Sequence, residues 1–69
     1  MSKYELIIYW SSEDNCYIAV VPELDHLMAH GDTQEETLLN INKAIKLWIK
    51  VAKEDNLEIP IPKGRLTYA

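Results

Sequence analysis

The chain has 69 residues and a formal net charge of −4, with seven basic and eleven acidic residues. This length allows one domain, spanning residues 1–69, and the acidic balance argues against a generic nucleic-acid binder. Hydrophobic residues make up 48% of the chain, which excludes a disordered segment. There is no apolar run of about 20 residues and no visible secretory signal, and the single Cys16 fits a reducing compartment. We therefore expect a cytoplasmic protein without a membrane span.

The first part of the chain predicts three strands. Residues 4–10 are rich in β-branched and aromatic residues, and residues 16–21 form a second apolar run. The polar residues 11–15 between them are turn formers, so the pattern indicates a hairpin. Pro22 lacks a backbone N–H and ends the second strand. Residues 27–31 predict a short third strand.

A long helix is predicted after the third strand. Asp32 and Thr33 are competing N-caps, each with a glutamate three residues later that completes a capping box. The helix extends to about Asp55, and Asn56 suits a left-handed residue at its C-terminus. Seven apolar residues fall within an arc of about 140° on this helix: Leu38, Ile41, Ala44, Ile45, Trp48, Ile49 and Ala52.

The predicted order of elements defines an α+β fold. The three strands form a small antiparallel meander, and the helix packs on one face of it. Prolines keep the segment after the helix extended, and Arg65–Tyr68 has the composition for a short fourth strand. The order is then β-β-β-α, or β-β-β-α-β with the last strand.

The first two strands carry apolar side chains on both faces. An antiparallel sheet with one face in water alternates apolar and polar residues, and a single helix covers only one face. At 69 residues the chain also has little core of its own. We therefore expect Ile7, Tyr9, Ile18 and Val20 to form an interface with another copy of the chain, in a homodimer or a larger oligomer.

Charge is divided unevenly along the chain. Residues 1–36 carry one lysine and eight acids, a net charge of −7, whereas residues 37–69 carry six bases and three acids, a net charge of +3. The acids of the first half lie in predicted loops and at the helix start. They are either solvated loop residues or a docking surface for a basic protein. The helix lysines form one stripe without interleaved aromatics, which is typical of a solvated face.

No pattern in the chain predicts catalysis. His26 and His30 would lie about 13 Å apart on an extended segment, too far for one metal ion. Cys16 has no histidine at a nucleophile-like spacing, and free cysteine is usually a buried apolar residue. Gly-rich phosphate loops and paired CxxC motifs are absent. We expect no enzyme activity, no catalytic or metal-binding residues and no cofactor.

Two ordered motifs resemble the HicB-like antitoxin domains. Residues 9–24 give a strand, an acidic turn and a second strand that ends in Pro-Glu-Leu. Residues 29–38 contain Gly-Asp-Thr-Gln-Glu-Glu at the helix start, and residues 44–49 are similar to the helix of that family. The resemblance covers residues 4–56. It implies a partial ribonuclease-H-like fold, with the element order predicted above.

The resemblance also implies a partner. HicB proteins neutralise HicA, a small basic ribonuclease with a catalytic histidine, by covering its active site. On this basis we expect five residues of the loops to face the toxin: Trp10, Glu13, Asp14, Glu23 and Asp25. Many HicB antitoxins carry a C-terminal DNA-binding domain, and the chain shows none before Ala69, so no direct DNA binding is expected.

Three other functions are open at this point. The chain could be an orphan HicB-like oligomer that binds another protein and has no cognate toxin. It could be a relic of a metal-dependent nuclease, although the apolar first strand and inward helix face argue against that. It could also bind nucleic acid weakly through the lysine stripe. Trp10 has two readings, as a core residue or as an aromatic anchor at an interface.

Overall fold

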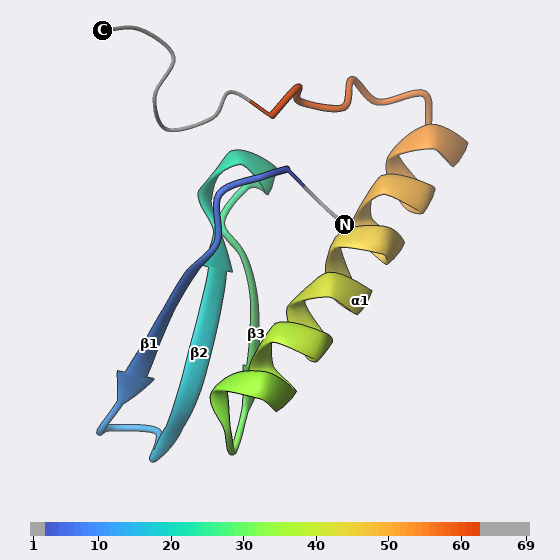
Figure 1. Cartoon of the computed structure of the whole chain (residues 1–69). Helices are drawn as coiled ribbons and strands as arrows, with labels where there is room; N and C mark the ends of the chain where they lie inside the picture. Colours follow the sequence, from blue (N-terminus) through green and yellow to red (C-terminus); the bar gives the residue numbers. More distant parts are fainter. Residues whose placement is uncertain (1–2, 63–69) are drawn as a thin grey trace, which may run out of the picture.

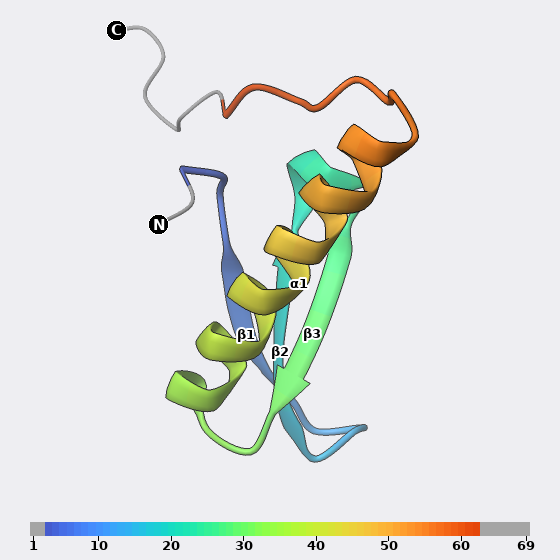
Figure 2. The same cartoon turned by 90° about the vertical axis from the view of Figure 1, so that its right-hand side faces the viewer.

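A computed structural model describes residues 3–62 of the chain. The elements are β1 (Ile7–Ser11), β2 (Cys16–Val21), the 3-10 turn η1 (Pro22–Leu24), β3 (Leu27–Gly31) and α1 (Gln34–Glu54). The strands form one antiparallel sheet in the order β1-β2-β3, and α1 crosses one face of it (Figures 1 and 2). The predicted α+β fold is confirmed. The fourth strand predicted at Arg65–Tyr68 lies outside the described residues.

β1 is shorter at its start than predicted, because it begins at Ile7 rather than at residue 4. The register pairs Ile7 with Val20, so the residue opposite Glu5 would be Pro22, which has no N–H to donate. The N–H of Glu5 instead donates to the carboxylate of Glu23, 3.0 Å away. β2 and β3 have the predicted bounds.

The core lies between α1 and the face of the sheet that it covers. Its buried side chains come from β2, η1 and α1: Ala19, Val21, Leu24, Ile41 and Ile45. Further apolar residues from the chain ahead of β1, from β3 and from α1 pack around this cluster while still partly exposed. Leu38, which the helical arc places with the core, is instead exposed at its edge.

The start of α1 is held by two reciprocal side-chain hydrogen bonds. Thr33 is the N-cap, and its Oγ1 accepts from the N–H of Glu36 at 3.0 Å. The carboxylate of Glu36 accepts from the N–H of Asp32 at 2.7 Å. Thr33 rather than Asp32 is therefore the N-cap that the structure selects. In the usual capping box the glutamate accepts from the N–H of the N-cap residue. Here Glu36 accepts instead from the N–H of Asp32, the residue before the N-cap.

Gly31 lets the first turn of α1 lie directly against the end of β3. A Cβ at this position would stand 2.8 Å from Thr37 Oγ1 and 2.9 Å from the Thr37 backbone nitrogen. Thr37 is fully buried, and its hydroxyl donates to the carbonyl of Thr33 at 2.7 Å. Because one of these close neighbours is backbone, a side chain at position 31 would require the first turn of α1 to shift away from β3.

Left-handed residues mark the ends of elements. Asp25 and His26, with φ of 57° and 58°, turn the chain from η1 into β3. Two consecutive residues with positive φ form the type of tight turn that favours asparagine, aspartate and glycine. At the other end of the molecule Asn15, with φ 56°, leads into β2. Asn56, with φ 57°, follows α1 as predicted.

Beyond α1 the chain crosses the end of the molecule that carries η1 (Figure 1). The Tyr4 hydroxyl donates to the carbonyl of Pro60, which ties this segment to the residues ahead of β1. Within the described part of the chain, no helix combines the length and apolar character that a membrane span requires.

Replacing Gly31 with alanine should destabilise the fold by about 1–3 kcal/mol, because the new Cβ overlaps the first turn of α1. The free energy of unfolding from urea denaturation measures this loss. Asp32→Ala is the matched control, since the exposed side chain is removed and the backbone N–H that bonds Glu36 stays. The control should change stability by less than about 0.5 kcal/mol. Equal stability of both variants would contradict the role given to Gly31.

Candidate functional site

The search for a functional site begins with the polar and metal-ligating side chains of the described residues. Among residues 3–62, no three histidine, cysteine, aspartate or glutamate side chains form a group able to hold a metal ion. His26 lies in the left-handed turn ahead of β3, and His30 is the fourth residue of β3. In the same part of the chain every buried side-chain nitrogen and oxygen has a hydrogen-bond partner. The candidate site must therefore be sought among exposed side chains.

The five residues predicted to face a toxin do not form one surface. Trp10, Glu13 and Asp14 lie at the β1–β2 turn, whereas Glu23 and Asp25 lie at η1, at the other end of the sheet (Figure 1). The length of β2 separates the two groups. The sequence places Trp10 at the end of a strand and the other four in loops, and an antiparallel hairpin sends successive loops to opposite ends of the sheet.

The two residues at the η1 end have roles within the fold. Glu23 accepts from the N–H of Glu5 and so anchors the segment that precedes β1. Asp25 occupies a left-handed position in the turn. At the β1–β2 turn the Asp14 carboxylate accepts from the Ser11 hydroxyl at 3.0 Å, and Glu13 is exposed. The hydrogen bonds of Glu23 and Asp14 and the left-handed backbone of Asp25 explain those three acids by the fold. Glu13 is the acid of the four that the fold explains least.

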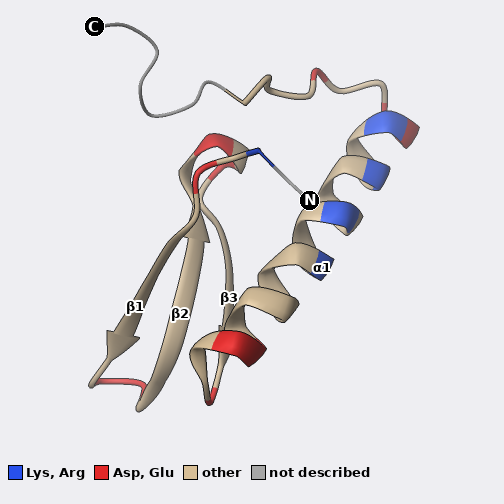
Figure 3. Cartoon of the chain, viewed as in Figure 1, with Lys and Arg blue, Asp and Glu red and all other residues tan. Residues whose placement is uncertain are grey.

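The structure adds three further carboxylates to the β1–β2 turn. The end of β3 pairs with the start of β2, because Gly31 lies opposite Tyr17. The link from β3 to α1 therefore comes to the same end of the sheet as the β1–β2 turn (Figure 3). We call this region the acidic end. Its exposed carboxylates are Glu13, Asp14, Asp32, Glu35 and Glu36.

A hollow opens between β1 and the first turns of α1, beside the acidic end. Its volume is about 360 Å³, and its lining includes Ile8, Leu38 and the carboxylate-bearing Glu35. Trp10 lies on the same face of β1 as Ile8, two residues further along. Trp10 is 50% exposed and meets Tyr17 edge to face, with ring centroids 5.1 Å apart. It is thus an exposed aromatic residue, not a core residue.

The face of the sheet that α1 does not cover is apolar. We call it the open face and define it by six side chains from the three strands: Ile7, Tyr9, Ile18, Val20, Met28 and His30. They alternate with residues that point to the core, so they share one face. The four residues predicted for a self-interface are all among them. Their side chains lie together, and the interface itself stays a prediction.

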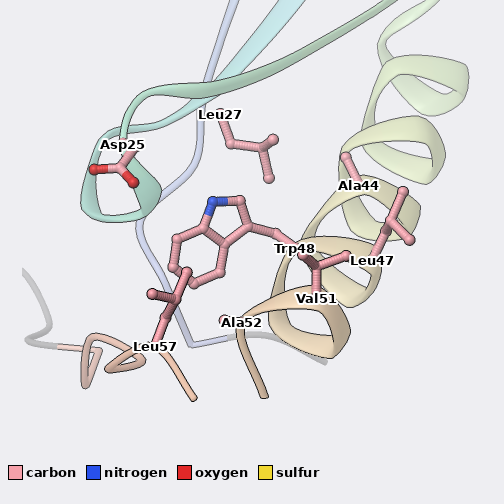
Figure 4. A pocket seen from close by; sticks show the side chains of 8 residues that line it. All are labelled: Asp25, Leu27, Ala44, Leu47, Trp48, Val51, Ala52 and Leu57. Carbon is pink, nitrogen blue, oxygen red and sulfur yellow. The ribbon is translucent and has the colours of Figure 1, made fainter. Parts of the chain in front are cut away.

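A second hollow lies at the end of α1 remote from the acidic end (Figure 4). Its volume is about 340 Å³, and the Trp48 indole lies between Leu27 and Leu57 there. The outward residues Leu47 and Val51 extend its apolar wall along α1. Apolar residues at outward helical positions are the one pattern in the sequence that points to this hollow, because its far wall comes from Leu57 in the chain after the helix.

The lysine positions of α1 lie on the side of the helix away from the sheet (Figure 3). All four are exposed along the outward side of the helix: Lys43, Lys46, Lys50 and Lys53. Positive charge therefore runs along the outer side of the later turns of α1, while negative charge gathers at its start. This separation follows the helix macrodipole, which favours acids at the start and bases towards the end.

Comparison with known proteins identifies the family. The sequence model of the UPF0150-like family matches residues 3–60. The chain belongs to the UPF0150-like family. The UPF0150 protein Ta0767 of Thermoplasma acidophilum is 40% identical over 58 residues, which cover 84% of this chain and 83% of that protein. The UPF0150 protein ssl0259 of Synechocystis sp. is 33% identical over 57 residues, covering 83% and 77%. No solved structure matches the chain significantly.

The region matched by the UPF0150-like family contains both motifs on which the antitoxin resemblance rests. Pro22-Glu23-Leu24 forms η1, where Leu24 is fully buried. The residues from Gly31 to Glu36 form the close contact and the cap at the start of α1. Both motifs build the fold. Asp32, Glu35 and Glu36 of the second motif are nevertheless exposed, so these residues both build the helix start and belong to the acidic end.

The distinction between Glu23 and Glu13 can be measured. Glu23→Ala should lower the free energy of unfolding by about 1–2 kcal/mol, because the N–H of Glu5 loses its charged acceptor. Glu13→Ala removes an exposed carboxylate from a turn and should change stability by less than about 0.5 kcal/mol. Urea denaturation of both variants provides the comparison. Equal effects would show that Glu23 does not anchor the segment ahead of β1.

Proposed function

We propose that the chain is a HicB-like antitoxin that binds a small basic ribonuclease of the HicA type and covers its active site. The observation that carries this proposal is the acidic end, whose exposed carboxylates include Glu35, a residue that also lines the hollow beside Ile8 and Leu38. Membership of the UPF0150-like family and the two motifs that resemble HicB-like domains support it. The action is set in the cytoplasm, where messenger RNA is available and Cys16 stays reduced.

The chemistry of the acidic end suits a basic RNA-cleaving enzyme. Such an enzyme holds RNA through lysine and arginine side chains that contact phosphates. Carboxylates can bind the same cations, and arginine pairs with them in a bidentate geometry. The acidic end would therefore occupy the surface that RNA needs. Opposite charge mainly raises the rate of association and sets orientation.

The apolar part of the site would supply most of the affinity. A long basic side chain can place its methylene stem against Ile8 and Leu38 while its charged head meets Glu35. Trp10 is half exposed beside this end and is of the residue type that most often anchors interfaces. Inhibition would then depend on contacts from β1, the β1–β2 turn and the start of α1 together.

We expect the chain to act by binding and not by catalysis. A ribonuclease-H-like reaction needs carboxylates on the first strand and on the inward helix face to hold divalent metal ions. β1 carries Ile7 and Ile8 at its start, and α1 turns Ile41 and Ile45 inward. The test is RNA cleavage by the purified chain with Mg²⁺, for which we expect no activity.

A second candidate is an orphan interaction module that self-associates and has no toxin. The open face favours it, because that surface is apolar and suits contact between identical chains. The two candidates differ in one respect. An antitoxin has a basic ribonuclease partner, commonly encoded beside it, whereas an orphan module has none.

The first experiment is co-purification of the chain with the small basic protein encoded beside it, followed by an RNA-cleavage assay. A stable complex that suppresses cleavage supports the antitoxin. If the neighbouring protein cleaves RNA equally well in the presence of the chain, the proposal fails. If no such protein is encoded and the chain associates only with itself, the orphan module is favoured.

Reversing the charge of Glu13 and Asp14 should weaken inhibition of the ribonuclease. For Glu13→Lys with Asp14→Lys, we expect the association rate at low salt to fall about tenfold or more, with a smaller loss at high salt. Surface plasmon resonance at several salt concentrations measures both effects. Circular dichroism checks the fold, because Asp14 accepts a hydrogen bond from Ser11.

The matched control reverses two adjacent acids at the other end of α1. Glu54→Lys with Asp55→Lys makes the same change in net charge, and both side chains are exposed near the end of the helix (Figure 3). The control should retain most of the association rate. If both double variants lose the same amount, net charge and not the acidic end controls the encounter.

A further inference from the structure

The hollow beside Trp48 is lined by residues from several segments of the chain. Asp25 comes from the turn between η1 and β3, Leu27 from β3, Trp48 from α1 and Leu57 from the chain that follows the helix (Figure 4). We call it the Trp48 hollow. Small-molecule sites in proteins commonly measure about 300–1,000 Å³ and are mostly apolar, with a few polar groups. At about 340 Å³ the Trp48 hollow has the size for one small ligand.

Small residues of α1 leave room for the hollow. Ala44 and Ala52 stand one turn before and one turn after Trp48, on the same side of the helix, and both line the hollow. Each contributes only a methyl group, so the space beside the indole stays open. Ala44 is partly exposed. A larger side chain at position 44 would therefore extend into the hollow.

One charged group stands among these apolar walls. Of the described residues that line the hollow, Asp25 alone carries a charge. Asp25 is exposed, and its carboxylate makes no hydrogen bond or ion pair with another described residue. Asparagine and glycine suit a left-handed turn position as well as aspartate does, so the turn itself does not require the charge. The four lysines of α1 are not among the lining residues.

Trp48 gives the same hollow a surface that attracts cations. Its indole lies between Leu27 and Leu57 (Figure 4). The face of an aromatic ring carries negative electrostatic potential, and indole attracts cations more strongly than the rings of tyrosine or phenylalanine. The carboxylate of Asp25 acts in the same direction and repels an anion. The hollow therefore favours an organic cation over a neutral or anionic molecule of the same shape.

We propose that the Trp48 hollow binds a small organic amine with a compact apolar body. The apolar body lies against Leu27, Trp48 and Leu57, and the ammonium group meets the carboxylate of Asp25. The occupant is a free small molecule and not a basic protein, because a basic protein finds more carboxylates at the acidic end. The two regions lie at opposite ends of α1, so this site is separate from the proposed antitoxin surface.

Titration of the full chain with phenethylamine, followed by the indole N–H resonances in heteronuclear NMR spectra, provides the test. A ligand of this size binds in about the millimolar range, so the titration extends to about 10 mM. The Trp48 resonance should shift and saturate. The chain has one other tryptophan, Trp10, which lies beside the acidic end. Its resonance reports general attraction of cations and should move much less.

Two further ligands separate charge from apolar contact. Phenethyl alcohol and phenylacetate carry a neutral and a negative group on the same ring. We expect phenethyl alcohol to bind about threefold to tenfold more weakly than phenethylamine, and phenylacetate to bind more weakly still.

Two variants locate the site and keep its tryptophan. Asp25→Asn suits the left-handed turn and removes the charge, so the affinity for phenethylamine should fall to that for phenethyl alcohol. Ala44→Leu fills the hollow and should weaken phenethylamine and phenethyl alcohol alike, by about tenfold. The matched control is Asp32→Asn, which removes an exposed carboxylate at the acidic end. It should leave the response of Trp48 unchanged. Circular dichroism checks the fold of each variant.

Three results would overturn the proposal. One is a Trp48 resonance that phenethylamine does not shift. Another is equal binding of phenethylamine and phenylacetate, which would exclude a role for charge. The third is a Trp48 response that Asp25→Asn leaves intact, which would place the amine elsewhere. None of these results bears on the acidic end, so the proposed antitoxin function is tested separately.

Discussion

The arrangement of the molecule depends on the absence of a side chain at position 31. The first turn of α1 lies so close to the end of β3 that a Cβ there would approach the Thr37 backbone nitrogen to 2.9 Å. Together with the hydrogen bonds of Thr33 and Glu36, this contact sets where the helix begins and on which side of the sheet it lies. One face of the sheet is thereby covered, and the other is left open.

The same contact brings two acidic loops to one end of the molecule. Because α1 starts beside the end of β3, its first-turn glutamates lie at the end that carries the β1–β2 turn (Figure 3). The glutamates that stabilise the helix start through the macrodipole thus also contribute to the acidic end. The residues that stabilise the helix start are therefore the same residues that would contact a basic partner in the proposed function.

Charge and apolar surface are assigned to different parts of this small protein. Carboxylates gather at the acidic end, lysines line the outward side of α1, and the open face has neither. Electrostatic attraction acts over about 10 Å and directs approach, whereas apolar contact acts only on touching.

Local signals in the sequence were sufficient for most of the fold. The apolar runs, Pro22, the threonine and glutamate of the cap and the periodicity of the helix are read over a few residues, and they located β2, β3 and α1 correctly. The two-sided apolar pattern of the strands also placed Ile7, Tyr9, Ile18 and Val20 on one face. Such patterns repeat with the geometry of the backbone itself, so they do not require knowledge of distant contacts.

Features that join distant residues were decided only by the tertiary structure. The start of β1 depends on Pro22, which follows β2 and lies opposite Glu5 in the register, and the exposure of Trp10 depends on how far α1 reaches along the sheet. The five residues predicted to face a toxin lie at two ends of the sheet, while Glu35 of α1 lies at the same end as the β1–β2 turn. Sequence distance does not report which loops share an end of a sheet. That depends on strand direction and on the packing of the helix.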